Sequence, residues 1–395
     1  MEVIQQDGCL PILNWAKGID AATLRQATHV AQHPCVVNRV ALAPDAHCGF
    51  GVPIGCILAA DKAVIPNAVG VDIGCSMSAC KTNIAAAELS REQLQEIVGG
   101  TQGRKTGLFA AIPVGANHHR EPQEHPLFEE TARWESTRIC RAELESARYQ
   151  LGTMGGGNHF IELQADADGC VWYMIHSGSR NLGNKVGTYY NKLAEELCSL
   201  YRQNEVVQHR LAFLPEGAEE YELYVREMQL CMDFARANHE RMQQLLEGVL
   251  REHIPGIEFG ERLYTRHNYA ALEHHDGRDL WIHRKGAVLA REGVRAIIPG
   301  SQGTASYIVE GLGNPRSFCS ASHGSGRVLS RTQAQQQLSL EAEQQRLSHV
   351  VHTLHTTSQL DEAPSAYKDI EEVIRLEDDL VRPLVRLTPL AVVKG

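Results

Sequence analysis

The sequence has few aromatic residues, no apolar run long enough to cross a bilayer and no excess of positive charge. Aromatic side chains make up 6% of the 395 residues, so we expect no extended platform of stacked rings. A transmembrane helix needs about 18 or more consecutive apolar residues, and none occurs, so no membrane association is expected. The formal net charge of −10 argues against a protein that coats nucleic acids, but it is compatible with a local basic groove.

Signals for export and for disulfide bonding are also missing. The first residues contain no basic segment followed by an apolar one, so we expect no secretory signal peptide. The 11 cysteines show no repeated spacing. Without an export signal, this pattern predicts free thiols in a reducing compartment, and we expect the protein to be cytoplasmic.

The familiar motifs of nucleotide-binding and zinc enzymes are absent. Residues 103–106 (GRKT) approach the end of a phosphate-binding P-loop, but their lysine is displaced. Residues 49–55 (GFGVPIG) have the wrong spacing for a dinucleotide-binding fingerprint, and their proline would not open a helix. Neither K-x-D-G, the lysine-nucleophile motif of common nucleotidyltransferases, nor H-E-x-x-H occurs.

Strand and helix patterns alternate along the whole sequence. Short apolar runs broken by glycine and proline predict strands in residues 1–80, 151–183 and 260–330. Helical patterns occupy much of residues 85–150 and 333–380. Apolar residues at i, i+3 and i+4 predict a helical insertion over about residues 185–255, with a methionine-bearing stripe that packs in the core. Because strands recur from beginning to end, we predict one large α+β domain over residues 1–395.

Side chains that bind metals occur on several glycine-rich turns. A regular strand would point Asp72 and Cys75 to opposite faces, but Gly74 can supply a kink that brings them together. Histidines in similar settings are His159, His176, His267 and His323. Each residue alone also fits an ordinary buried thiol or a loop imidazole. Their recurrence favours a site for one or two divalent ions, and ligand softness allows zinc as readily as manganese or iron.

Three loops carry the groups that bind phosphate. Residues 177–180 (SGSR) and 323–327 (HGSGR) each offer backbone N–H groups, hydroxyls and one guanidinium, and residues 299–306 form a third glycine-rich loop. Such loops form concave anion sites, and an arginine adds a bidentate clamp. The alternative for any single loop is an ordinary turn.

The motifs taken together resemble those of the RtcB family of RNA-splicing ligases. The matching runs appear in order from about residue 35 to the last residue. They are residues 44–47 (PDAH), 49–55, 69–75 (VGVDIGC), 155–162 (GGGNHFIE), 175–180 (IHSGSR), 267–269 (HNY), 298–301 (IPGS), 322–327 (SHGSGR), 366–370 (AYKDI) and 393–395 (VKG). The resemblance implies a single RtcB-type domain, in which strands and glycine-rich loops surround a central cleft.

The resemblance also implies an activity. RtcB-type enzymes join an RNA 3′-phosphate or 2′,3′-cyclic phosphate end to a 5′-hydroxyl end in RNA splicing, including tRNA splicing, or in RNA repair. They use GTP as co-substrate, two Mn2+ ions, a guanylylated histidine and an activated RNA-(3′)pp(5′)G end. RNA and GTP are therefore the expected partners, and a protein activator is left open. Alternatives are an enzyme that caps 3′-phosphates or opens cyclic phosphates without sealing, and an inactive RNA-binding or metal-storage protein.

The resemblance assigns roles to individual residues. It implies that Cys75 bridges both metal ions, that His176 and His267 complete one metal site, and that Asp72 and His159 complete the other. It gives His323 the role of the nucleophile that carries GMP, with Asp72 and Arg180 as further catalytic residues. The implied nucleotide contacts are Asn158, His159, Glu162, Ser301, His323, Gly324, Gly326, Tyr367 and Lys394.

The remaining expectations concern charge around the reacting groups. The resemblance implies that Asp45 orients the catalytic imidazole and that Arg180 and Arg327 clamp RNA phosphate or triphosphate. Because the chain is acidic, RNA would have to lie in a local basic groove, for which Arg180, Arg284, Lys285 and Arg327 are candidates.

Overall fold

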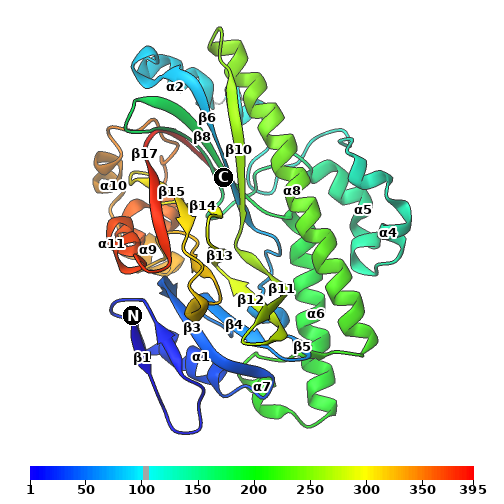
Figure 1. Ribbon diagram of the computed structural model, residues 1–395. Helices are drawn as coiled ribbons and strands as arrows, with labels where there is room; N and C mark the ends of the chain where they lie inside the picture. The colour runs from blue at the N-terminus through cyan, green and yellow to red at the C-terminus, as the bar shows by residue number, and fades with distance from the viewer. Residues whose placement is uncertain (101–105) are drawn as a thin grey trace.

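A computed structural model describes residues 1–100 and 106–395, and it contains two large β-sheets flanked by helices (Figure 1). Of the P-loop-like run at residues 103–106, only Thr106 belongs to the described part. The six-stranded sheet has the order β1 (Glu2–Ile4), β2 (Ile12–Asn14), β3 (Val36–His47), β4 (Ile54–Ala60), β12 (Arg278–Lys285), β11 (Asn268–His275). The seven-stranded sheet has the order β10 (Phe259–Arg266), β6 (Ser76–Ala85), β8 (Cys170–Ser177), β7 (Phe160–Ala165), β17 (Val381–Lys394), β15 (Ser306–Gly311), β14 (Arg295–Ile298).

Both sheets combine strands from distant parts of the sequence. Strand β17, at the C-terminal end, lies between β7 and β15, and β12 pairs with β4 from the N-terminal part. Two short sheets add β13 (Ala287–Leu289) with β16 (Ser320–Ser322) and β5 (Ala63–Val64) with β9 (Leu214–Pro215). The strands therefore cannot be divided into separate modules, and the prediction of a single α+β domain is confirmed.

The seven-stranded sheet is buried on both faces, which explains the nearly continuous apolar sequence of β8. Tyr173 and Ile175 belong to the hydrophobic cluster that includes residues of helices α2 (Arg91–Val98) and α8 (Glu219–His253). Trp172 and Met174 alternate with them and belong to a second cluster on the other face. A strand covered on both sides needs apolar residues at every position.

The helices lie around the sheets. Besides α2 and α8 they are α1 (Ala21–Ala31), α3 (Gly107–Ala111), α4 (Thr131–Glu135), α5 (Ile139–Gln150), α6 (Arg180–Leu200), α7 (Asn204–Gln208), α9 (Arg331–Gln337), α10 (Leu340–Arg346) and α11 (Ile370–Leu376). Short 3-10 turns are η1 (Pro66–Ala68), η2 (Ala86–Glu88), η4 (Pro126–Glu129), η5 (Pro315–Ser317), η6 (Thr357–Glu362) and η7 (Pro364–Ala366). None of the helices in the described part is both long and apolar enough to span a lipid bilayer.

Helices α5, α6 and α8 pack together beside the sheets (Figure 1). The 35 residues of α8 bury the predicted stripe, which includes Met228, Cys231 and Met242. The buried carboxylate of Glu227 in α8 accepts hydrogen bonds from the first backbone N–H groups of α5, at 2.9 Å from Ile139 N and from Cys140 N. A carboxylate at this position satisfies N–H groups that have no partner within their own helix.

Candidate metal and nucleotide site

Strand register brings four predicted metal ligands together at the ends of four neighbouring strands of the seven-stranded sheet. Ser76, at the start of β6, pairs with Ser177 at the end of β8 and with Arg266 at the end of β10. Phe160, at the start of β7, pairs with His176. The residues next to these pairs are Cys75, His159 and His267, so one thiol and three imidazoles meet although they are up to about two hundred residues apart in sequence.

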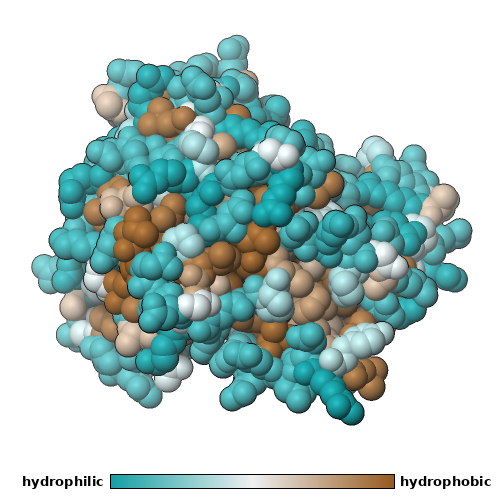
Figure 2. Space-filling view, turned by 60° about the horizontal axis from the view of Figure 1, so that its bottom comes forward, coloured by the Kyte–Doolittle hydropathy of each residue, from teal (hydrophilic) through white to brown (hydrophobic). Residues whose placement is uncertain are grey.

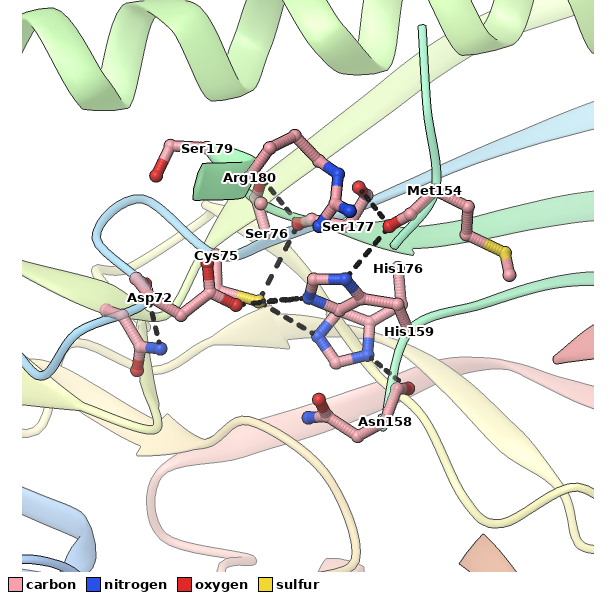
Figure 3. Close-up of polar contacts among 12 residues, drawn as sticks. Asp72, Cys75, Ser76, Met154, Asn158, His159, His176, Ser177, Ser179 and Arg180 are labelled. Carbon is pink, nitrogen blue, oxygen red and sulfur yellow. Dashed lines mark hydrogen bonds and ion pairs between the residues drawn. The ribbon is translucent and has the colours of Figure 1, made fainter. Parts of the chain in front are cut away.

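The thiol lies at the centre of this cluster, as Figure 3 shows. Cys75 Sγ is 3.4 Å from His159 Nε2 and 3.3 Å from His176 Nε2. His176 Nε2 is 3.3 Å from His267 Nε2. Asp72 Oδ2 is 3.1 Å from His159 Nε2. The five predicted ligands therefore form one continuous, mostly buried group.

A tight turn, and not a kinked strand, brings Asp72 and Cys75 together. The backbone N–H of Cys75 donates to the carbonyl of Asp72 at 3.2 Å, just before β6 begins. Gly74 has φ of +77°, and a Cβ there would lie 3.0 Å from Met232 Cα of α8. Glycine is needed at this position because the turn is left-handed and packs directly against a helix backbone.

The hydrogen bonds of two imidazoles turn their Nε2 atoms toward the cluster. His159 Nδ1 is 2.9 Å from the carbonyl of Met154, and His176 Nδ1 is 3.1 Å from that of Asn158. A carbonyl only accepts, so each Nδ1 carries the proton and each Nε2 presents a lone pair to the cluster. The Nε2 of His159 then faces the Asp72 carboxylate, and buried His267 Nδ1 has no partner. A cation bound between these atoms would use the Nε2, thiol and carboxylate groups as ligands.

Burial also affects the protonation states of the cluster. It lowers the pKa of His176 and of His267 well below the ordinary value, with a further contribution from neighbouring imidazoles. Burial and the charge of Asp72 raise the pKa of the Cys75 thiol well above its usual range. The donor atoms of Cys75, His159 and His176 lie within 4.8 Å of one another, which is a metal-binding arrangement. Neutral imidazoles with a thiol and a carboxylate fit a divalent transition metal.

Helix α8 supports the loops that carry these ligands. The amide of buried Asn238 accepts hydrogen bonds from Gly152 N at 2.7 Å and Thr153 N at 3.1 Å, and it donates to Gly178 O at 3.2 Å. The next residue, His239, lies 3.2 Å from the carbonyl of Ser177 through Nε2. The long helix of the predicted insertion therefore holds the backbone on both sides of His176. Sequence reasoning missed Asn238 because its partners are 60 or more residues away.

The imidazole of His323 lies beside the metal-type cluster, directly after β16. Its ring centroid is 4.9 Å from that of His267. Fully buried Asp45, from β3, accepts hydrogen bonds through Oδ2 from His323 Nδ1 at 2.6 Å and from His323 N at 3.2 Å. Burial alone would raise the pKa of Asp45, but the charge and hydrogen bond of His323 lower it. The proton therefore stays on Nδ1, and Nε2 is the free nitrogen.

A cavity of about 410 Å³ opens in front of His323 and the metal-type cluster. Its walls include many residues predicted from sequence: Asp72, Asn158, Glu162, His176, Ser301, His323, Gly324, Gly326, Arg327, Tyr367 and Lys394. They also include residues that sequence reasoning missed: His47, Gln302, Arg331 and Glu362. Cys75, His159 and His267 do not appear among the described lining residues and lie behind this surface.

Three basic side chains of the cavity share one buried carboxylate, that of Glu362. Its Oε1 is 3.2 Å from the nearest guanidinium nitrogens of Arg327 and of Arg331, and its Oε2 is 3.1 Å from Lys394 Nζ. The Tyr367 hydroxyl donates to the same carboxylate. Burial alone would raise the pKa of Glu362, but Lys394, Tyr367 and the two arginines bring it below the usual range. The cluster retains more cationic than anionic groups.

A second carboxyl in the cavity wall has the opposite electrostatic surroundings. Glu162 is buried in β7, beside β17, and Gln164 donates a hydrogen bond to it. Burial raises the pKa of Glu162 to about 8, because the Gln164 hydrogen bond and the charge of Lys394 compensate only in part. Glu162 is therefore protonated at neutral pH in the protein without nucleotide.

The structure changes the expected positions of several basic residues. The prediction that Arg284 lines an RNA groove is wrong, because its side chain is 0% exposed and pairs with Glu273 at 2.5 Å. Lys285 is also buried, and its Nζ donates to the carbonyl of Phe50 at 2.8 Å. Arg180 donates to Thr153 Oγ1 at 3.1 Å and to Gly115 O at 3.2 Å. It lies near Asp72, outside the described lining of the cavity.

Comparison with known proteins gives the family. The family model described as tRNA-splicing ligase RtcB matches residues 26–395. The chain belongs to the RtcB family. The RNA-splicing ligase RtcB1 of Escherichia coli (strain ATCC 25922) is 37% identical, over 98% of this chain and 97% of the relative. The RNA-splicing ligase RtcB of E. coli K12 is 36% identical over the same shares, and the tRNA-splicing ligase RtcB of Nanoarchaeum equitans is 30% identical over 94% and 91%.

The family resemblance read from the motifs is therefore confirmed over nearly the whole chain. RtcB proteins are RNA ligases, enzymes that form phosphodiester bonds. The candidate metal site formed by Cys75, His159 and His176 is consistent with a metal-dependent RtcB ligase.

Proposed function

We propose that the protein is a GTP-dependent ligase that joins RNA 3′-phosphate or 2′,3′-cyclic phosphate ends to 5′-hydroxyl ends, in RNA splicing or repair. One observation carries the proposal: Asp45 holds Nδ1 of His323 at 2.6 Å, and His323 lines the cavity beside a cluster of metal-type ligands. The relatives named RNA-splicing and tRNA-splicing ligases support the same type of reaction.

The reaction needs an activated end, because a 3′-phosphate carries no good leaving group. His323 Nε2 attacks the α-phosphorus of GTP, a P–N bond forms, and the bond to the β-phosphate oxygen breaks so that pyrophosphate leaves. Asp45 accepts the hydrogen bond from Nδ1–H and stabilises the positive charge that develops on the ring. A neutral imidazole is nucleophilic near pH 7, and its P–N bond is labile enough to pass the group on.

The remaining steps regenerate the histidine. An oxygen of the RNA 3′-phosphate attacks the GMP phosphorus, the P–N bond breaks, and RNA-(3′)pp(5′)G forms. The 5′-hydroxyl of the second RNA then attacks the RNA 3′-phosphorus, the new phosphodiester forms, and GMP departs. Transfer through a covalent histidine replaces one difficult displacement with steps that each have a good leaving group.

We propose two Mn2+ ions as the metals of this site. Cys75 would bridge them, His176 and His267 would complete one site, and Asp72 and His159 the other. When bound, such ions neutralise charge on phosphate oxygens. The 11 cysteines, all in the described part of the chain, are free, which supports work in a reducing compartment such as the cytoplasm.

We assign GTP to the cavity wall that carries the predicted nucleotide contacts. Gly324, Gly326 and Ser301 supply backbone N–H and hydroxyl groups beside His323, where the α-phosphate would lie. Arg327 supplies a guanidinium for phosphate oxygens. Asn158, Glu162, Tyr367 and Lys394 provide polar groups for the rest of the nucleotide. Arg180, close to Asp72, would add positive charge behind the reacting phosphates.

The test is detection of the covalent intermediate. Incubating the protein with GTP and manganese should add the mass of GMP to the intact protein, and His323→Ala should abolish the adduct. His349→Ala is a matched control, because His349 belongs to no part of the described cavity lining. An adduct of undiminished yield in His323→Ala would remove His323 from this role.

A further inference from the structure

The loop between β3 and β4 presents an aromatic ring to solvent. Phe50 is 56% exposed, and among the described phenylalanines and tryptophans it is the exposed one. Figure 2 shows one face of the molecule, where hydrophilic residues cover most of the surface and brown apolar residues stand out between them. A single exposed ring is common on protein surfaces, so its meaning depends on what holds it and what lies beside it.

The backbone of this loop is held firmly, so the exposure of Phe50 does not come from a loose segment. The side-chain amide of Gln26 in α1 donates to Gly49 O at 2.7 Å and accepts from Gly49 N at 3.0 Å. The buried ammonium of Lys285 donates to Phe50 O at 2.8 Å. The backbone of Gly49 and of Phe50 is thus fixed to two different parts of the fold.

A guanidinium lies against the exposed ring. Arg210 Cζ is 3.9 Å from the centroid of the Phe50 ring, which is a cation–π contact. The backbone at Arg210 is itself held, because its carbonyl accepts from Asn67 Nδ2 at 2.8 Å. Gly51 has φ of +72°, and a Cβ there would lie 2.6 Å from Arg210 O, so the loop packs directly on this backbone. The pair therefore combines a flat apolar surface with a positive charge.

The Phe50–Arg210 pair lies next to the cavity. His47 and Ile54, on either side of the loop, both line the cavity, and Phe50 is three residues from His47. Three residues span at most about 10 Å of extended chain. Lys285, which holds the loop, precedes Gly286, where a Cβ would lie 3.0 Å from His323 Cε1. The loop that carries Phe50 is thus flanked by cavity-lining residues and is held by a residue next to the one that contacts His323.

We propose that Phe50 and Arg210 form a stacking subsite for a nucleotide of the RNA strand next to the end that is joined. The inference rests on the proposed ligase function. A base stacks on an aromatic ring whatever its sequence, and a guanidinium beside the ring attracts the phosphate that follows. This chemistry suits a single-stranded RNA end, and it does so with one ring in a chain that has few.

The test compares RNA binding with a step that needs no RNA. In a ligation assay with GTP, manganese and short single-stranded RNAs ending in 3′-phosphate and 5′-hydroxyl, Phe50→Ala should raise the KM for RNA about tenfold. In the absence of RNA, the protein–GMP adduct should form from GTP and manganese at the wild-type rate. Phe50→Trp should retain the wild-type KM, and Phe50→Leu, which keeps an apolar side chain without a ring face, should not.

Two further variants complete the design. Tyr201→Ala is the matched control, because Tyr201 is an aromatic residue that is 77% exposed at the end of α6, and it should leave the KM unchanged. Arg210→Gln should also raise the KM for RNA, and it provides a second measurement if Phe50→Ala lowers the melting temperature.

The outcomes separate the two proposals. An unchanged KM in both Phe50→Ala and Arg210→Gln overturns the stacking subsite, as does an equal loss in Phe50→Ala and Phe50→Trp. An effect that arises only when a partner protein is added, with unchanged KM in the purified enzyme, also overturns it in favour of a protein-binding role. Absence of the GMP adduct in the wild-type protein contradicts the ligase proposal instead.

Discussion

Two groups of side chains at the cavity differ in electrostatic character. The first, the ligand cluster, lies partly behind the cavity wall and consists of Asp72, Cys75, His159, His176 and His267, whose N, O and S atoms lie 3.1–3.4 Å from one another. The second, the cationic cluster, consists of Arg327, Arg331, Glu362, Tyr367 and Lys394, in which three basic groups share one carboxylate. The first consists of potential metal donors, and the second has a surplus of positive charge. This difference supports the proposal that metal and nucleotide phosphate bind on adjacent sides of His323.

The two buried glutamates of the cavity show the same difference on a smaller scale. Glu362 has three basic neighbours, and its pKa is lowered. Glu162 has Lys394 as the basic group that acts on it, and burial raises its pKa to about 8. Both side chains are almost completely buried, so the number of neighbouring cations, and not exposure, decides which one is charged.

The largest effect is expected from removing the centre of the ligand cluster. Cys75→Ala should abolish stoichiometric metal binding and reduce ligation by about a thousandfold or more, because charge neutralisation by metal contributes several kcal/mol. Elemental analysis of the purified protein measures the metal directly. Cys198→Ala, which removes another buried thiol outside the cluster, is the control. Unchanged metal content in Cys75→Ala would contradict the bridging role.

A smaller effect is expected from removing the shared carboxylate of the cationic cluster. Glu362→Gln removes the negative charge that holds Lys394 at 3.1 Å, and it should raise the KM for GTP about tenfold while metal content stays the same. Glu343→Gln changes another buried carboxylate, which bonds Ser365 outside the cavity, and serves as the control. A lower KM in Glu362→Gln would mean that Glu362 competes with the nucleotide phosphates for the basic groups.

The third prediction concerns stability and its dependence on pH, with no expected change in the reaction itself. The pKa of Glu162 rises from 4.5 to about 8 on folding, so the folded protein keeps a proton that the unfolded chain loses. Its contribution to the free energy of unfolding is complete below pH 4.5 and decreases as the pH rises towards 8. The free energy of unfolding of Glu162→Gln, relative to that of the wild type, should therefore increase by about 1 kcal/mol for each pH unit in this window.

Glu362→Gln should show the reverse dependence in the same experiment. The folded pKa of Glu362 is lowered, so its contribution is present above its unfolded value of 4.5 and is lost as the pH falls through the folded value. Urea unfolding of the metal-free, nucleotide-free proteins between pH 4 and pH 9 measures both variants. If the free energy of unfolding changes with pH in the same way in both variants, the electrostatic contrast between the two glutamates is contradicted.

Motifs allowed the ligand cluster to be predicted far better than its surroundings. Asp72, Cys75 and the three imidazoles each lie in a short run that is recognisable in sequence, and strand register brings them together. Asn238 and Glu362 lie in no such pattern, because each acts on partners distant in sequence. The run at residues 361–364 (DEAP), just before the AYKDI motif, was the one available signal for Glu362.

The fold itself could be predicted as a class but not as a topology. Recurring apolar runs predicted strands and helices in one α+β domain, yet the position of β17 between β7 and β15 depends on pairings between residues 70 or more positions apart. Arg284 was predicted for the RNA groove because a sequence shows its charge and not its burial against Glu273. Such long-range contacts are decided by packing, which no local pattern records.

The most direct test of the central claim is a ligation assay with the purified, manganese-loaded protein, GTP, and RNAs that end in 3′-phosphate and 5′-hydroxyl. The account predicts a joined product that forms only with GTP and that disappears in His323→Ala. If RNA accumulates with a 3′-linked GMP cap, or if cyclic phosphates are opened, and no joined product forms over the range of broken RNAs tested, the protein is not a ligase and the account is contradicted.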